Sequence, residues 1–326
     1  MASSPSLPTK PGLDDHPPVT PYLPLIVGIA AASTSSIFIR FAQREAPSLV
    51  IAAYRLSIAT LLLLPMVLRD WKRHLRPLTA RLWQLSILSG LFLTVHFATW
   101  ISSLEFTSVA SSVALVQTAP IIVALLSPFF LKERLAPLTW LGIGIAFAGS
   151  VLISVSDVCA MHMFSLSCPE AGSLWGDQAL KGDVLALAGA VSVSGYLLIG
   201  RKIRSKMSLL AYLFLTYGTA ALSLTLLAVL AGQPFTGYSP TIYLWFLLLA
   251  LLPQLTAHSS VNWALRYLPA AIVSIFLLGE PIGSTILAIF ILDEIPPSLR
   301  IWGGIAVIAG ILLTVLARNH PPRRSG

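Results

Sequence analysis

Charged residues are scarce in this chain. Asp, Glu, Lys and Arg make up only 10 % of its 326 residues, whereas about 25 % is usual in soluble domains. This sparse polar coat excludes a soluble globular protein, and a hydrophobic share of 56 % excludes a disordered one. Cysteine is also rare, because two residues are too few for a disulfide scaffold or a cysteine-based metal cluster.

The chain is rich in long apolar segments, and its mean hydropathy is +0.83. A membrane-spanning helix needs roughly 20 mostly apolar residues. Backbone polar groups in lipid must be satisfied within the segment, which favours helices over open strands. Ten segments are long and apolar enough, and the predicted spans are 22–42, 48–68, 83–103, 107–130, 138–157, 182–200, 208–231, 243–264, 269–291 and 298–317.

Lys and Arg are unevenly distributed between the two sides that these spans define. With ten spans both termini lie on one side, which carries 16 of the 21 basic residues; the other side carries 4, and Arg55 lies inside a span. The positive-inside rule makes the side of the termini cytoplasmic. The net charge of +8 is therefore a feature of membrane topology, and we expect no nucleic-acid binding. The expected location is a cell membrane, either a plasma or an inner membrane.

The two halves of the sequence match at an offset of 161 residues. Pro120 aligns with Pro281 and Glu133 with Glu294, each at the same offset. Each half holds five predicted spans, an odd number, so the second half enters the membrane from the opposite side. Inverted repeats of this kind are typical of transporters, with the substrate site near the midplane between the halves. The alternative is an old duplication that packs without transporting.

The residues around the aligned prolines resemble those of the EamA domain. The marks are TAP ending at Pro120 and followed by LKERL, LGEP ending at Pro281 and followed by LDE, and Arg55 within AAYRLSIA. Two tandem copies resemble the drug/metabolite transporter superfamily over about residues 22–318. Two departures are the long loop at 158–181 and Ala119, which stands where the second half has Glu280.

The resemblance implies an all-α integral membrane protein of ten helices, arranged as two inverted five-helix repeats in a basket. Helices 1, 3, 4, 6, 8 and 9 would surround a central cavity. It further implies transport, since similar proteins move amino acids, nucleobases, sugars and other metabolites. The inverted repeat favours alternating access. The mix of an acid, histidines, an amide and aromatic residues in the spans suits a small metabolite such as an amino acid or a nucleobase, with proton coupling and exchange as the candidate driving mechanisms. We expect a disordered tail at 1–21, a first repeat at 22–157, an extracytoplasmic loop at 158–181, a second repeat at 182–318 and a cytoplasmic tail at 319–326.

Polar side chains inside the spans are the candidates for the transport site. An ionisable group costs about 2.5–3.5 kcal/mol at the centre of a membrane helix, so such groups are functional candidates by default. Pro120 and Pro281 are expected to kink their helices. The candidate cavity residues are Glu280, Gln117, His96, Trp100, His258, Asn262, Trp263, Ser36 and Arg55.

Glu280 is the leading candidate, because it lies near the middle of the ninth span and precedes a proline. It could bind a cationic group or carry a proton, and the alternative is a structural carboxylate bonded to a hydroxyl of a neighbouring helix or to Arg55. Arg55 either snorkels to the outer interface or bonds backbone carbonyls, or it lines a substrate path. His96 and Trp100 lie four residues apart on one helix face, where they could stack a planar or cationic substrate.

Each of the other candidates also has a structural interpretation. His96 could be a core histidine with a hydroxyl partner, and His258 and Asn262 could form helix–helix hydrogen bonds. Ser36 could serve the close packing of the first span. The small residues of the fifth and tenth spans could serve a dimer or internal packing, and they include Gly142, Ala146, Ser150, Gly303 and Gly310.

An enzyme is not expected, because the chain has no H-E-x-x-H helix, no G-x-S-x-G elbow and no phosphate-binding loop. A membrane-embedded enzyme and a non-transporting scaffold or sensor are the alternatives to a transporter. The expected partners are the lipid bilayer and a small-molecule substrate, with no cofactor or metal, and the chain would be a monomer or a homodimer. Cys159 and Cys168 lie nine residues apart in the long outer loop, as a disulfide or as two unpaired thiols.

Overall fold

The computed structural model describes residues 17–107, 109–156, 160–162, 165–167, 177–292 and 297–319. Parts of the two predicted tails, Cys159, Cys168 and Glu294 lie outside these ranges. The ten predicted membrane spans are confirmed within the described residues. They are Tyr22–Ala42, Ser48–Arg69, Ala80–Phe106, Ser111–Phe130, Pro137–Val155, Gln178–Ile203, Leu209–Leu230, Pro240–Ala264, Ala270–Leu287 and Ser298–Ala317, and we number them one to ten.

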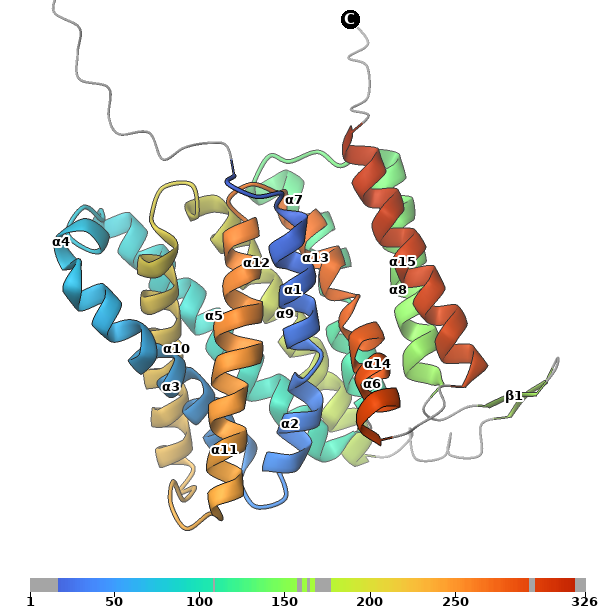
Figure 1. Ribbon diagram of the computed structural model, residues 1–326, viewed down its shortest axis with the longest axis horizontal. Coiled ribbons are helices and arrows are strands. Elements are labelled where there is room, and N and C mark those ends of the chain that lie inside the picture. The colour runs from blue at the N-terminus through green and yellow to red at the C-terminus, as the bar shows by residue number, and fades with distance from the viewer. Residues whose placement is uncertain are drawn as a thin grey trace, which may run out of the picture.

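The spans alternate in direction through a bundle of helices (Figure 1). The first helix begins and the last helix ends on the face drawn uppermost, which we call the terminal face. The opposite face carries the connections after spans one, three, five, seven and nine, and we call it the loop face. Each half of the chain contributes five spans, so the two halves are inverted with respect to each other, as predicted.

Six spans are single long helices. Spans one, four and nine are each divided into two helices by two non-helical residues, and span eight contains a π-helical segment. The single helices are α3 (Ser48–Arg69), α5 (Ala80–Phe106), α8 (Pro137–Val155), α9 (Asp177–Ile203), α10 (Leu209–Leu230) and α15 (Ser298–Asn319). The composite spans are α1 (Tyr22–Ala32) with α2 (Ser35–Ala42), α6 (Val109–Val116) with α7 (Ala119–Phe130), α11 (Pro240–Leu249) with the π-helical η2 (Ala250–His258) and α12 (Ser259–Ala264), and α13 (Ala270–Leu277) with α14 (Glu280–Leu292).

Proline fixes where spans four and nine break. Pro120 and Pro281 each occupy the second position of the helix that follows the break, α7 and α14. A proline lacks a backbone N–H, so it costs no hydrogen bond in the first turn of a helix, whereas in a helix interior it removes one. The two breaks are related by the same offset as the sequence repeat.

A pair of serines shows that the repeat extends to contacts. The hydroxyl of Ser33 donates to the backbone carbonyl of Glu280 at 2.9 Å. The hydroxyl of Ser194 donates to the carbonyl of Ala119 at 3.3 Å. The offset of 161 residues relates Ser33 to Ser194 and Ala119 to Glu280, so the two hydrogen bonds are equivalent in the repeat. A serine from the first span of each half therefore bonds the broken helix of the other half.

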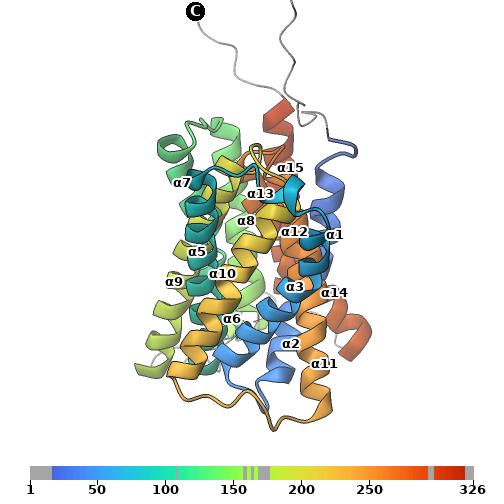
Figure 2. The ribbon, with the colours of Figure 1, turned by 90° about the vertical axis from the view of Figure 1, so that its left-hand side faces the viewer.

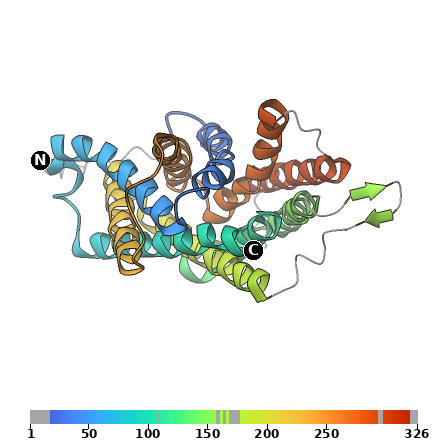
Figure 3. The same cartoon turned by 90° about the horizontal axis from the view of Figure 1, so that it is seen from below.

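The helices pack most closely in three groups. Helix α5 lies against α9, α10 packs on α3 and α5 (Figure 2), and α8 pairs with α15 at one end of the molecule (Figure 1). The short helix α4 (Trp71–His74) lies at the terminal face. The predicted outer loop at 158–181 contains a two-stranded antiparallel hairpin of β1 (Ala160–His162) and β2 (Ser165–Ser167), which extends beyond the helices (Figure 3).

The pair of α8 and α15 is held together by facing glycines. A Cβ placed on Gly149 would lie 2.6 Å from the carbonyl oxygen of Gly303 and 2.7 Å from the backbone nitrogen of Val307. A Cβ on Gly310 would lie 2.5 Å from the nitrogen of Ala146. Small residues allow backbones in a membrane to approach this closely. The small-residue faces of the fifth and tenth spans therefore serve internal packing in this structure.

Candidate functional site

A cavity lies where the broken middles of spans four and nine face the eighth span. The space open to the centres of water molecules is about 100 Å³, which is room for several waters or a small solute. Its wall takes residues from spans one, two, three, four, six, eight and nine, so both halves of the chain build it. The ring implied by the resemblance is present, and span two is added to it.

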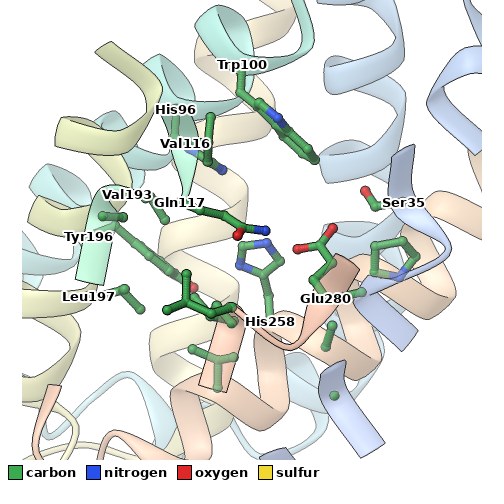
Figure 4. Close-up of a pocket in the computed structure, with 18 of the residues that line it drawn as sticks. Ser35, His96, Trp100, Val116, Gln117, Val193, Tyr196, Leu197, His258 and Glu280 are labelled. Atoms are coloured by element: carbon green, nitrogen blue, oxygen red, sulfur yellow. The ribbon is translucent and has the colours of Figure 1, made fainter. Parts of the chain in front are cut away.

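Six of the predicted candidates line this cavity. They are Arg55, His96, Trp100, Gln117, His258 and Glu280. The carboxylate of Glu280, the imidazole of His258 and the amide of Gln117 point toward one another, with Trp100 at the edge of the same space (Figure 4). The two prolines of the breaks lie beside them, and Pro120 itself contributes to the wall. The broken helices thus bring polar groups from distant parts of the chain together.

Three candidates do not reach the cavity wall, which corrects the prediction for them. Asn262 is buried, and its amide donates to the hydroxyl of Tyr196 and to the carbonyl of His258. Trp263 packs on Tyr267 with ring centroids 4.8 Å apart. Ser36 does not line the cavity, whereas its neighbour Ser35 does. Asn262 and Trp263 lie on the regular helix α12, whose Val261 lines the cavity in their place.

Arg55 is buried rather than snorkelling, so that interpretation is wrong. Its Nε donates to Oε1 of Gln254 at 2.9 Å, and a terminal nitrogen donates to the hydroxyl of Ser35 at 3.1 Å. The guanidinium carbon lies 4.3 Å from the ring centroid of Phe97, a cation–π contact. Within the described residues no carboxylate oxygen lies within 4.0 Å of it. Arg55 therefore joins span two to spans one, three and eight through neutral partners.

His96 and Trp100 form a flat aromatic wall on α5. Their ring centroids are 5.6 Å apart with an interplanar angle of 12°. Nδ1 of His96 lies 3.0 Å from the carbonyl oxygen of Gly189. A carbonyl can only accept, so Nδ1 carries a proton, and the neutral ring keeps Nε2 as an acceptor. The partner of this histidine is a carbonyl on α9 rather than the hydroxyl considered from the sequence.

Several polar atoms at the cavity have no partner within the described residues. They are Nε1 of Trp100, Oε1 of Gln117 and Nδ1 of His258, all buried. A buried polar atom left without a hydrogen bond costs about 1–3 kcal/mol, and such exceptions call for a ligand or water. The cavity therefore presents a donor, an acceptor and an imidazole nitrogen that a solute could satisfy.

Three further residues at the site were not singled out from the sequence. Ser35 and Tyr196 line the cavity. Gln254 does not line it, but its side-chain oxygen accepts a hydrogen bond from Arg55. Gln254 lies four residues before His258, so the helical spacing of polar residues was a signal that could have found it. Tyr196 offered no such signal, because an aromatic residue in an apolar span is usually part of the packing.

The model of the EamA-like transporter family matches residues 20–155 and 180–316 of the chain. The chain belongs to the EamA-like transporter family. An uncharacterized transporter of Archaeoglobus fulgidus is 28 % identical over 292 residues, covering 88 % of this chain and 93 % of its own. A riboflavin transporter of Brucella anthropi is 25 % identical over 285 residues, covering 86 % of this chain and 91 % of its own.

The fold is also found among solved structures. One crystal structure superposes with a TM-score of 0.72 at 18 % identity and covers 91 % of this chain and 98 % of its own. At this identity the match shows the fold alone. The EamA-like chain is thus a multi-pass membrane protein of a transporter family, and the relatives named above are transporters rather than enzymes.

In this EamA-like transporter, a charged network joins the helix ends on the terminal face. Nε of Arg201 lies 2.6 Å from Oε1 of Glu133. A terminal nitrogen of Arg201 donates to the carbonyls of Leu265 and Arg266 at 3.0 Å each. The second oxygen of Glu133 accepts from the backbone N–H of Ala270 at 3.4 Å. Spans four, six, eight and nine are therefore held together on this face.

A second arginine strengthens the same face of the EamA-like bundle. Arg204 is buried, and it donates to the carbonyl of Asn262 at 2.9 Å and to that of Met207 at 2.8 Å. Burial lowers the pKa of Arg204 to about 10, so the guanidinium stays charged at neutral pH. Its charge thus stabilises a carbonyl of α12 and one in the connection between α9 and α10.

Proposed function

We propose that this protein moves a small metabolite, of the size of an amino acid or a nucleobase, across a cell membrane by alternating access. The observation that carries the proposal is the cavity near mid-membrane, built by both inverted halves and lined by unpartnered polar atoms. Substrate sites of inverted-repeat transporters lie at this depth, where broken helices expose backbone and side-chain polar groups. The relative named a riboflavin transporter adds a larger planar solute to the candidates.

Glu280 is the proposed carrier of a coupling proton. It is the one acid among the described residues that line the cavity. Its side chain reaches the same space as His258 and Gln117 (Figure 4), so a proton and a solute would meet there. Exchange of one substrate molecule for another is the second candidate driving mechanism, and it needs no protonation step.

The termini are proposed to be cytoplasmic, on the basis of the 16 to 4 split of basic residues between the two sides. The proposed units are the repeats at 22–157 and 182–318, joined by an extracytoplasmic segment at 158–181. The proposed tails are 1–21 and 319–326. The chain would work as a monomer or a homodimer in the plasma or inner membrane.

The orientation is testable by cysteine labelling in intact cells, after both native cysteines have been replaced by serine. Thr236 is exposed in the connection after span seven, at the loop face, and Lys72 is exposed on α4, which lies at the terminal face (Figure 1). A membrane-impermeant maleimide added outside should label Thr236→Cys and spare Lys72→Cys until the cells are permeabilised. Labelling of Lys72→Cys alone in intact cells would reverse the proposed orientation.

The experiment that tests the function is solute flux into proteoliposomes containing the purified protein. Radiolabelled L-phenylalanine, adenine and riboflavin serve as probes, with protein-free liposomes as the control. We expect saturable uptake of at least one probe that unlabelled solute competes away. Release of a chemically altered probe would indicate an enzyme instead, and the absence of flux for all three would contradict the proposal.

A further inference from the structure

The cavity holds one positive and one negative side chain among the described residues that line it. They are Arg55 and Glu280, and they lie close enough to interact electrostatically but not within the 4.0 Å of a salt bridge. Charges buried in a low-dielectric interior are normally paired, because leaving water costs several kcal/mol per ion. Here two opposite charges share one cavity without neutralising each other directly.

Neither charge has its bonding capacity filled by protein groups. The guanidinium of Arg55 has five N–H donors, and within the described residues it donates hydrogen bonds to the neutral side chains of Gln254 and Ser35. The carboxylate of Glu280 has no ion-pair partner within the described ranges; its backbone carbonyl, not its side chain, is what Ser33 bonds. Each charge can therefore accept an opposite group from a solute.

The rest of the wall restricts the body of such a solute. Apart from the polar groups described above, the cavity is lined by aliphatic side chains, among them Val116, Val193 and Leu277. The stacked rings of His96 and Trp100 supply a flat face on one side. Apolar walls favour an aliphatic or aromatic body, and the unpartnered indole N–H of Trp100 favours an acceptor such as a carboxylate oxygen.

We propose that the cavity selects a zwitterion: a solute with an ammonium group that binds Glu280, a carboxylate that binds Arg55, and an apolar or aromatic body, as in a hydrophobic α-amino acid. This inference rests on the proposed function of the cavity as the transport site. A neutral planar solute would leave the charges of both Arg55 and Glu280 without an opposite charge. A simple amine would pair only with Glu280, and a simple acid only with Arg55. The ammonium and a proton compete for the same carboxylate, so substrate binding and protonation of Glu280 exclude each other.

The test is a thermal-shift titration of the purified full-length protein with matched ligands. L-Phenylalanine carries both charges, phenethylamine only the ammonium and 3-phenylpropanoate only the carboxylate, and riboflavin is the neutral planar probe. A charge-assisted hydrogen bond contributes about 1.5–3 kcal/mol, so the half-ligands should bind roughly tenfold to a hundredfold more weakly than phenylalanine. L-Leucine and L-methionine repeat the comparison with aliphatic bodies.

A variant separates charge recognition from a structural role. In Glu280→Gln the preference for phenylalanine over 3-phenylpropanoate should fall to about twofold or less, because the partner of the ammonium is lost. Glu45→Gln is the matched control; it replaces an exposed carboxylate at the loop face and should keep the wild-type preference. Arg55→Lys keeps the positive charge and should still favour phenylalanine over phenethylamine.

The outcomes distinguish this inference from the function on which it rests. Binding and flux of riboflavin or of a half-ligand, without binding of any of the three amino acids, would overturn the zwitterion inference and leave a transporter. An unchanged ligand preference in Glu280→Gln would overturn it as well. Absence of flux for every ligand in proteoliposomes would instead overturn the proposed function.

Discussion

Uptake driven by a pH gradient should be lost when Glu280 is replaced by glutamine. The carboxamide keeps the volume and the hydrogen-bonding capacity of the side chain but cannot take up a proton. Exchange of labelled for unlabelled solute across proteoliposomes without a gradient should persist with a raised KM, because that process needs no protonation. The measurement is the initial rate of uptake of radiolabelled L-phenylalanine, adenine and riboflavin with and without an imposed gradient.

The pH dependence of binding has a definite sign under this account. As the pH falls, a carboxylate takes up a proton and loses its charge, so an ammonium-bearing solute should bind wild type more weakly at low pH. Glu280→Gln should show a flat profile. Arg55, His96 and His258 also line the cavity, so a pH profile that survives in Glu280→Gln would assign the titration to the histidines.

Glu45→Gln is the control for this experiment as well. The carboxylate of Glu45 accepts from the backbone N–H and the hydroxyl of Ser239 at 2.8 Å each, at the loop face. These hydrogen bonds, the backbone one foremost, hold the pKa of Glu45 below its usual range, so it stays ionised through the working range. Its variant should retain gradient-driven uptake. Equal uptake by wild type and Glu280→Gln under a gradient would show that Glu280 is structural and that the protein is a facilitator.

Gly149→Val should destabilise the protein strongly, because the new side chain has no room between α8 and α15. Its Cβ would lie 2.6 Å from a carbonyl oxygen and 2.7 Å from a backbone nitrogen. Forcing extra carbons into a packed contact costs about 1–3 kcal/mol or more, and here the obstacle is backbone rather than a movable side chain. The measurement is the melting temperature in detergent, which should fall by several degrees.

Gly144→Val is the matched control on the same helix. Gly144 is exposed, and a Cβ placed there meets nothing within 4 Å. Its melting temperature should stay close to that of wild type. A similar loss of stability in both variants would mean that valine acts through helix propensity, and the close contact between α8 and α15 would then not be what holds the pair together.

The sequence predicted the fold well, because the features that decide it are long-range averages. Apolar length identifies the spans, and one constant offset relates Pro120 to Pro281 across the chain. Much of the cavity could also be predicted, since Glu280, Gln117 and His258 are polar residues in apolar helices. Such groups must either meet a partner helix or face a cavity, and their depth in the span narrows the choice.

The hydrogen-bond partners of Arg55 and Asn262 could not be predicted, because they lie on other spans and the pattern within one helix does not show them. From the sequence alone, Arg55 could be expected to snorkel to the interface. In the structure it instead donates hydrogen bonds to Gln254 and Ser35, which belong to other spans. Asn262 was expected on the cavity side because it lies four residues after His258. Its amide instead donates to the hydroxyl of Tyr196 on α9, a partner that the spacing within one helix does not show.

The central claim is that solute passes through the cavity at the breaks of spans four and nine. Val116 lines that cavity from α6, whereas Leu125 of the same span is 54 % exposed on the outer surface of the bundle. Val116→Trp and Leu125→Trp therefore add the same bulk to one span, inside and outside the cavity. The measurement is uptake of labelled L-phenylalanine, adenine and riboflavin into proteoliposomes holding equal amounts of each folded protein. The account predicts loss of flux in Val116→Trp with wild-type flux in Leu125→Trp; equal flux in both variants would contradict it.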